Sequence, residues 1–174
     1  MPRKSIPATT ALDHDLDEAE STTLAEVEPM DLESHIFFLC TQVVYRRDRA
    51  LNEALKPLGL TTSEYRTLSA ALRKGPLTMQ ALAQWTAYER TRLTHLLNGM
   101  EAQQWVTRAS SETDKRTVLV RIAPKGAALF KRAKAVVDRI TDDILRITTP
   151  ADIDQVRQTL RAMRQRLVEM EQGD

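Results

Sequence analysis

Residues 78–122 read TMQALAQWTAYERTRLTHLLNGMEAQQWVTRASSETDKRTVLVRI, in which two short helical segments precede two strand-like segments. Thr78 stands just before the first helical segment, residues 79–85, where its side chain can accept the free amides of the first turn. Residues 86–89 form a brief connection to the second helical segment, residues 90–103. A short helix, a tight connection and a second helix predict a helix-turn-helix.

The texture of the sequence changes after Trp105. Residues 106–109 are strand-like, residues 110–116 are entirely polar, and residues 118–122 are apolar and rich in β-branched side chains. This order predicts a β-hairpin with a charged tip. The helices and the hairpin together predict a mainly α fold, a winged helix-turn-helix with a small β-hairpin wing, over residues 61–123.

A further short helix is expected immediately before these elements. Thr61 and Glu64 fit the capping-box pattern, a hydroxyl residue followed three positions later by a carboxylate. The helix that they open is expected to run from Ser63 to about Arg73, and the Gly-Pro pair after Lys74 ends it.

Long helices are expected on both sides of this module. The first starts near Asp31, and two more start at Pro124 and Pro150, because proline suits the first helical position. Their apolar residues recur three or four positions apart, and the small central module cannot cover these stripes alone. We therefore expect residues 30–60 and 124–172 to form the helical dimerisation region of a two-fold symmetric homodimer.

The chain has 174 residues and a net charge of +1, which is unevenly distributed. Residues 1–33 hold two basic and nine acidic residues, a net charge of −7, and the remainder carries +8. We expect residues 1–29 to form an acidic, disordered tail, because acids and prolines occur there with little apolar periodicity. A basic body suits a polyanionic partner, although solvated helix faces also account for such a charge.

Composition excludes several classes of protein. Hydrophobic residues make up 42% of the chain, enough for a core, but no apolar run approaches the roughly 18 residues of a membrane span. A single cysteine excludes a disulfide scaffold. No apolar stretch follows Arg3 and Lys4, so a secretory signal is not expected. We expect a cytoplasmic protein without membrane contact.

Signatures of catalysis and of cofactor binding are also missing from the sequence. It contains no GxGxxG, P-loop, GxSxG or HExxH pattern. The three histidines, His14, His35 and His95, lie far apart, and one cysteine cannot form a zinc cluster. We therefore expect no enzyme activity, no cofactor and no metal site.

The second helix of the predicted helix-turn-helix carries the candidate DNA contacts. Its apolar side chains form the inward face, and these are Leu93, Leu96, Leu97 and Met100. The residues left nearer the major groove are Arg90, Thr91, Arg92, Thr94 and His95. Arginine grips guanine with two hydrogen bonds, and threonine hydroxyls commonly bind phosphate oxygens, which adds Thr78 to the candidates. Ordinary exposed helix residues that pair with Glu89 or water are the alternative interpretation.

The hairpin tip supplies a second set of candidates. Lys115 and Arg116 follow Asp114 at the expected turn. An arginine inserted into a narrow minor groove responds to its negative potential, and the Asp114 carboxylate could orient an arginine by charge pairing. A generic hydrophilic turn is the alternative, but it would not require arginine.

These segments carry a resemblance to a known family. They are Leu82-Ala83, Glu89-Arg90-Thr91-Arg92-Leu93-Thr94, Leu97, Met100-Glu101, Trp105-Val106-Thr107-Arg108, Asp114-Lys115-Arg116, Val118-Leu119-Val120 and Gly126. Together they resemble the MarR family of bacterial transcription regulators, over about residues 32–172. The resemblance implies an obligate homodimer that binds a double-stranded, pseudo-palindromic operator and represses a neighbouring gene until a small aromatic or lipophilic acid releases it.

The sequence departs from the family pattern at three places. Ala123 stands where the family usually has a helix-capping threonine, and alanine cannot accept the free amides. Gly99 lies inside the predicted recognition helix, where glycine costs about 0.8–1 kcal/mol relative to alanine. The acidic tail lies outside the pattern altogether.

The resemblance also implies an effector site between the dimerisation region and the winged module. Carried over to this chain, the candidates are His35, Phe38, Gln42, Tyr45, Arg46, Tyr65 and Arg66. Aromatic side chains beside one arginine or histidine suit a phenolic or benzoate-like acid, because arginine forks onto carboxylate oxygens. Ordinary core packing of the aromatic residues is the alternative.

Two other functional interpretations stay open. One branch of the family senses organic hydroperoxides through a cysteine near the start of the first helix, and Cys40 falls about three residues after that place. The apolar stripe around Cys40 favours a structural role instead. A winged helix that binds another protein rather than DNA is the second alternative, and the salt dependence of DNA binding distinguishes it.

Overall fold

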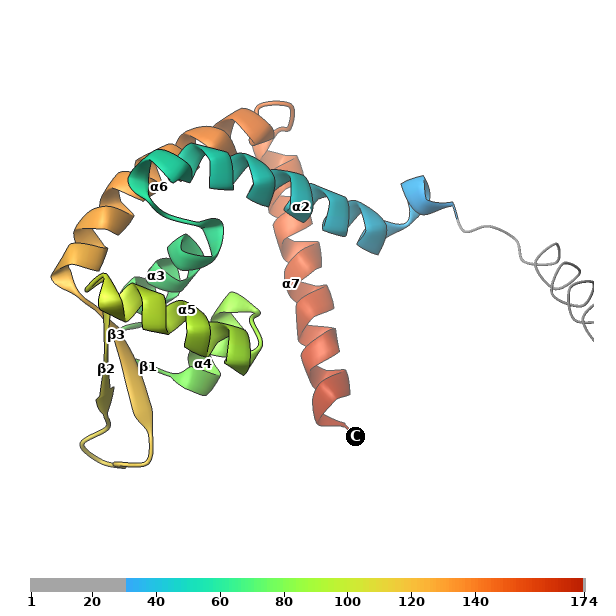
Figure 1. Ribbon diagram of the computed structural model, residues 1–174. Coiled ribbons are helices and arrows are strands. Elements are labelled where there is room, and N and C mark those ends of the chain that lie inside the picture. Colours follow the sequence, from blue (N-terminus) through green and yellow to red (C-terminus); the bar gives the residue numbers. More distant parts are fainter. Residues whose placement is uncertain (1–30, 174) are drawn as a thin grey trace, which may run out of the picture. The chain divides into compact units, whose positions relative to one another are not determined.

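The computed structural model describes residues 31–173, and the predicted acidic tail lies outside them. The elements in order are η1 (Leu32–Ser34), α2 (Ile36–Leu55), η2 (Lys56–Leu58), α3 (Thr62–Lys74), β1 (Leu77–Thr78), α4 (Met79–Thr86), α5 (Arg90–Ala102), β2 (Val106–Ser110), β3 (Val118–Ile122), α6 (Pro124–Leu145) and α7 (Pro150–Gln172). The chain divides into two compact units between Tyr45 and Arg46. Figure 1 shows these elements along the chain.

The described residues of the first unit open with a short 3-10 helix, η1, rather than with the long helix expected at Asp31. The Asp31 side chain accepts the Glu33 amide and caps η1. His35 then interrupts the helical backbone with extended torsion angles. Its ring accepts the Phe38 amide at 3.3 Å, so it satisfies one of the free donors at the start of α2.

The helix-turn-helix of the second unit is built as the sequence predicts. Thr61 and Glu64 form a reciprocal capping box that opens α3, and Thr78 accepts the Ala81 amide at the start of α4. Ala87 ends α4 in the left-handed conformation, with a φ of 56°. This residue turns the chain sharply into α5, whose first residue is Arg90.

A three-stranded antiparallel sheet completes the winged module. The predicted hairpin pairs Val106 with Ile122 and Ser110 with Val118. A third strand, the two-residue β1, pairs Leu77 with Val120 on the other edge of β3. The sequence did not predict β1, because two residues after a proline carry no readable alternation.

One apolar core joins the elements of the second unit from the end of α2 to α6, and α7 contributes no residue to it. Leu51 and Leu55 from the end of α2 are completely buried together with Leu68, Leu82 and Val120. The inward face predicted for α5 is confirmed, since Leu93, Leu97 and Met100 are buried and Leu96 packs against them. Fully burying a leucine contributes about 1.5–3 kcal/mol, so this face fixes the orientation of α5.

The start of α6 lies against the backbone that follows α5. The Ala123 amide donates to the Trp105 carbonyl oxygen at 2.9 Å. A Cβ atom on Gly126 would overlap that same carbonyl oxygen. Ala123 provides no side-chain cap, as expected, and Pro124 follows it at the first helical position.

The apolar stripe of α7 and the end of the stripe of α6 are left uncovered within one chain. No residue of α7 is buried, and its exposed apolar side chains are Val156, Leu160, Leu167, Val168 and Met170. Ile144 and Leu145 at the end of α6 are exposed as well, and Ile147 is 91% exposed. None of the helices within residues 31–173 is long and apolar enough to cross a membrane.

Replacing Gly126 with alanine is expected to lower the free energy of unfolding by about 1–3 kcal/mol, because overpacking against rigid backbone forces a shift. Denaturant unfolding of the purified protein measures this change. Gly99→Ala is the matched control, since an added Cβ there meets open space inside α5. It is expected to raise the free energy of unfolding by about 0.8–1 kcal/mol. Equal stability of the two variants would contradict the proposed role of the Trp105 contact.

Candidate nucleic-acid interface and ligand cavity

The exposed face of α5 is centred on three polar side chains. An α-helix turns by about 100° per residue, so Thr91, Thr94 and His95 lie opposite the buried leucines. All three are exposed. Asn98, one turn further along, shares this face and was not among the sequence candidates. Arg90 and Arg92 flank the face on opposite sides.

The Arg90 flank faces the wing. A shallow pocket of about 270 Å³ is lined by Thr78, Met79, Gln80, Arg90, Arg116, Thr117 and Val118. It brings together three of the predicted contacts, from the start of α4, the start of α5 and the wing. Its lining includes two guanidinium groups and no carboxylate. Cations beside the amino end of a helix favour an anion such as a phosphate.

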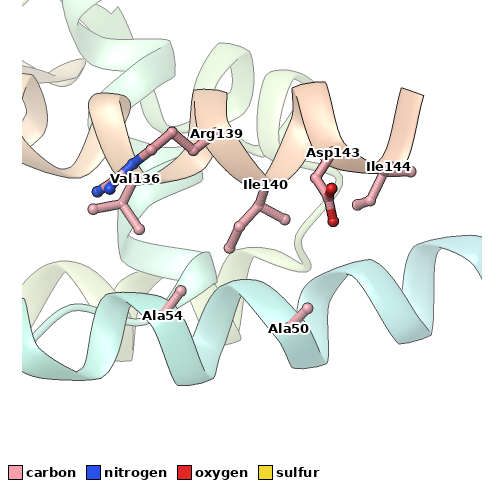
Figure 2. Close-up of a pocket in the computed structure, with 7 residues that line it drawn as sticks. All are labelled: Ala50, Ala54, Val136, Arg139, Ile140, Asp143 and Ile144. Atoms are coloured by element: carbon pink, nitrogen blue, oxygen red, sulfur yellow. The ribbon is translucent and has the colours of Figure 1, made fainter. Parts of the chain in front are cut away.

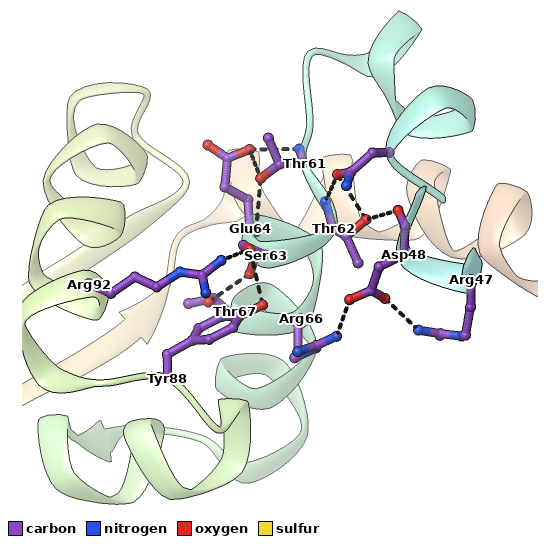
Figure 3. Close-up of polar contacts among 11 residues, drawn as sticks. Arg47, Asp48, Thr61, Thr62, Ser63, Glu64, Arg66, Thr67, Tyr88 and Arg92 are labelled. Atoms are coloured by element: carbon purple, nitrogen blue, oxygen red, sulfur yellow. Dashed lines mark hydrogen bonds and ion pairs between the residues drawn. The ribbon is translucent and has the colours of Figure 1, made fainter. Parts of the chain in front are cut away.

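The Arg92 flank faces α3 instead. Its guanidinium lies 4.4 Å from the centre of the Tyr88 ring and donates to Ser63 Oγ at 3.2 Å. Figure 3 shows the side chain extending from α5 toward these two residues. The Arg92 guanidinium, which the sequence predicts to contact a base, therefore has partners within the chain.

Asp114 orients the wing tip through hydrogen bonds. Its carboxylate accepts the Arg116 amide at 3.0 Å and the Thr117 hydroxyl at 2.7 Å. The Thr117 hydroxyl, and then the Arg116 amide, hold the pKa of Asp114 below its usual value. Within residues 31–173 the structure has no ion pair between Asp114 and the side chains of Lys115 or Arg116. The orientation comes from hydrogen bonds to the Arg116 amide and the Thr117 hydroxyl rather than from the expected charge pairing, and both cations stay exposed.

The root of the wing is clamped to α5 by Arg108 and Glu101, which belong to the segments that carry the family resemblance but were not among the predicted site residues. The Arg108 side chain donates to Glu101 Oε2 at 2.5 Å through one nitrogen and at 3.0 Å through another. The Arg108 amide donates to Glu101 Oε1, and the same guanidinium donates to Asn98 at 2.8 Å. These bonds fix the wing relative to the exposed face of α5. Opposite charges seven residues apart are too common in sequences to predict this contact.

The Arg108 guanidinium holds the pKa of the Glu101 carboxyl below its usual value of 4.5. A depressed folded-state pKa stabilises the protein above the unfolded pKa, and this contribution disappears as the pH falls through the folded value. Glu101→Gln is therefore expected to lower stability at pH 7 by at most about 1 kcal/mol, because the pair is partly exposed. The difference from wild type should shrink below pH 4.5 in thermal unfolding curves. A difference independent of pH would contradict the clamp.

A separate cavity of about 190 Å³ lies beside Tyr65. Its lining is Arg47, Leu51, Thr62, Tyr65, Arg66 and Ser69. The Tyr65 ring stacks on Phe130 with 5.2 Å between ring centres, and burial raises the pKa of its hydroxyl. Asp48 pairs with Arg66 at 3.0 Å and with Arg47 at 3.2 Å, so both arginines of the lining have a carboxylate partner.

The predicted effector residues are not all brought to this cavity. Tyr65 and Arg66 line it, whereas Arg46 is exposed and its neighbour Arg47 takes the expected position. The other candidates belong to the first unit, where Tyr45 is exposed and the rest are half-buried, namely His35, Phe38 and Gln42. Cys40 is a free, half-buried cysteine. Among the described residues there is no group of three His, Cys, Asp or Glu residues placed to hold a metal ion.

A larger groove of about 500 Å³ lies between the end of α2 and α6. Val136, Ile140 and Ile144 line it from α6, and the small residues Ala50 and Ala54 line it from α2. Figure 2 shows the Ile140 side chain pointing toward the two alanines. Arg139 and Asp143 form its polar part, so this surface is mainly apolar.

Comparison with known proteins identifies the family that shares this arrangement. A family model described as MarR family matches residues 58–117. The multiple antibiotic resistance protein MarR of Escherichia coli is 30% identical over 99 residues, which are 57% of this chain and 69% of that protein. This chain belongs to the MarR family. The MarR protein of Salmonella typhimurium is 32% identical over 94 residues, and the match spans 65% of its length and 54% of this chain.

Other similar proteins have different names, and some of their structures contain a ligand or DNA. The organic hydroperoxide resistance transcriptional regulator of Bacillus subtilis is 31% identical over 108 residues, 60% of this chain and 71% of that protein. The structure of CouR from Rhodococcus jostii RHA1, bound to p-coumaroyl-CoA, has a TM-score of 0.70 and 25% identity, and the match covers 78% of this chain and 95% of CouR. A mutant MarR from E. coli complexed with operator DNA has a TM-score of 0.66 and 25% identity over 72% of this chain and 90% of that one.

Proposed function

We propose that this MarR-family protein is a homodimeric transcriptional regulator, a repressor, that binds a pseudo-palindromic operator through α5 and the wing. The observation that carries the proposal is the pocket where Thr78, Arg90 and Arg116 converge beside the exposed face of α5. Phosphate contacts at this pocket would set the register of the protein on DNA, and Thr91, Thr94 and His95 would then face the base edges. The DNA-bound relative of E. coli supports this assignment.

The dimer follows from the faces that a single chain leaves exposed. Five apolar side chains of α7 are exposed, and so are two at the end of α6. The groove between α2 and α6 adds a mainly apolar lining, and exposed apolar faces of this kind mark protein–protein interaction sites. We assign this surface, within residues 30–60 and 124–172, to the second copy. A two-fold dimer would place two α5 helices at half-sites about 34–36 Å apart.

Binding of the purified protein to the DNA upstream of its own gene is expected to be tight at low salt. Fluorescence anisotropy should give two chains per site and a steep decrease of affinity with salt, about 0.9 in log–log slope per neutralised phosphate. Arg90→Ala and Arg116→Ala are each expected to weaken binding and to reduce that slope by about 1 for every phosphate that the variant no longer neutralises.

Arg146→Ala is the matched control, because Arg146 pairs with Asp143 at the end of α6. It should leave the salt slope unchanged. Absence of any binding at low salt would reject the DNA-binding proposal and favour a module that binds another protein.

We also propose that a small aromatic or phenolic acid releases the DNA by binding in the cavity beside Tyr65. A cavity of about 190 Å³ lies below the range of drug-sized sites, and so it suits a single aromatic ring. Arg47 and Arg66 would hold the carboxylate, and stacked Tyr65 would contact the ring. The aromatic acyl ligand in the CouR structure supports an aromatic effector class.

A panel of aromatic acids, with an organic hydroperoxide alongside, tests this in the same anisotropy assay. One acid is expected to raise the operator Kd, and Arg66→Gln should weaken that response by about tenfold or more, because a charge-assisted pair contributes about 1.5–3 kcal/mol. The hydroperoxide arm tests the second candidate, suggested by the Bacillus subtilis relative. Release by peroxide alone, reversed by a thiol and abolished in Cys40→Ser, would replace the acid with an oxidant.

A further inference from the structure

Tyr88 lies in the turn of the helix-turn-helix. It contacts α3, which lines the ligand cavity, and α5, the candidate recognition helix. Only 8% of its surface is exposed, and its amide donates to the Ala83 carbonyl oxygen. Its hydroxyl donates to Ser63 Oγ at 3.1 Å, which ties the turn to the first turn of α3. The ring is therefore held from two directions, by its own backbone and by α3.

Two arginines from different elements lie over this one ring. Arg92 of α5 lies 4.4 Å from the ring centre, and Arg66 of α3 lies 5.4 Å from it. Both distances are within the range of cation–π attraction, which is strongest where the partners are desolvated. Figure 3 shows Arg92 pointing toward Tyr88 and Ser63, and Arg66 pointing toward Asp48.

The Arg92 end of this contact belongs to the candidate recognition helix. Ser63 Oγ accepts hydrogen bonds from both Arg92 and Tyr88, and the Arg92 guanidinium also lies over the Tyr88 ring. Each of these three side chains therefore contacts the other two. Arg92 therefore links α5 to α3 through side chains, in addition to the buried leucines beneath. A change at Tyr88 would alter the support of α5 on this flank.

The Arg66 end belongs to the ligand cavity. Arg66 lines the cavity and pairs with Asp48 at 3.0 Å. An anion that enters the cavity competes with Asp48 for this guanidinium. The same guanidinium lies over Tyr88. When Arg66 exchanges Asp48 for another anion, its guanidinium therefore moves relative to the Tyr88 ring.

We infer that Tyr88 couples the cavity to α5, with Arg66 and Arg92 as the two ends of the coupling. Arg92 is then a positioning residue for the recognition helix rather than a reader of bases. The inference rests on the proposed function, since it names how the effector cavity regulates DNA binding. Coupling of this kind is a free energy shared by two sites, and a double-mutant cycle measures it without a known ligand.

Asp48→Asn removes the carboxylate partner of Arg66, and so it reproduces the loss of the Asp48 ion pair that a competing anion would cause. It is expected to raise the operator Kd about fivefold or more, the lower range of typical coupling between sites. In a Tyr88→Leu background the same substitution should change Kd less than twofold, because the ring that joins the two arginines is gone. Tyr88→Phe keeps the ring and should restore the full effect of Asp48→Asn.

Asp138→Asn is the matched control, because it is the same substitution at an exposed carboxylate that pairs with Lys134 rather than with Arg66 or Arg92. It should leave the operator Kd within twofold of wild type. If Tyr88→Leu does not fold, Arg92→Gln replaces it in the cycle, since Arg92 is exposed and outside the core. An equal effect of Asp48→Asn in both backgrounds would overturn the inference.

The side-chain Nε resonance of Arg92 gives a readout that does not depend on DNA. The Tyr88 ring current should displace this NMR resonance. Asp48→Asn is expected to shift it, whereas Asp138→Asn is not. If the wild-type protein binds no operator but Asp48→Asn still shifts the Arg92 resonance, the proposed function is rejected and the coupling is kept. Operator binding together with an unchanged resonance and an unchanged Kd in Asp48→Asn would reject the coupling alone.

Discussion

The carbonyl group of Trp105 is the point at which three parts of the molecule meet. It accepts the Ala123 amide at the base of the wing, and Gly126 lies so close to it that no larger residue fits. The end of α5, the hairpin and the start of α6 are thereby fixed relative to one another. The orientation of the wing relative to α5 and α6 depends on this contact, because close-packed backbone leaves no room for adjustment.

Three arginines around α5 illustrate how position decides what one residue type does. Arg90 faces the wing and joins Arg116 in a pocket without carboxylates. Arg92, two residues later, lies about 200° further around the helix and packs on Tyr88. Arg108 comes from the neighbouring strand and holds Glu101 and Asn98. Of the three, Arg90 presents its guanidinium to a surface of the kind that binds phosphate, whereas the other two support the surface that surrounds it.

The likeness to known structures extends over more of the chain than the family model. The family model matches the winged module alone, whereas CouR matches 78% of the chain. The long helices therefore share a fold with the relatives although their sequences carry fewer shared motifs. Apolar stripes explain this difference, since many combinations of leucine, isoleucine and valine cover the same helix face.

Local signals in the sequence were sufficient for the helices and the hairpin of the winged module. The capping box at Thr61, the cap at Thr78 and the alternation of residues 118–122 each act over a few neighbouring residues, so they predicted α3, α4 and the hairpin. The β1 strand and the 3-10 helix before α2 escaped prediction, because pairing with β3 and the interruption at His35 are not encoded in a local period.

The sequence by itself determined the helix-turn-helix, the wing and the apolar face of α5, because caps and periodicity depend on residues close together in the chain. Only the tertiary structure decided which arginine faces the wing, that Arg47 rather than Arg46 lines the cavity, and that Arg66 and Arg92 share the Tyr88 ring. Those contacts join residues from different elements. Their geometry depends on how the helices pack, and helix periodicity does not specify that packing.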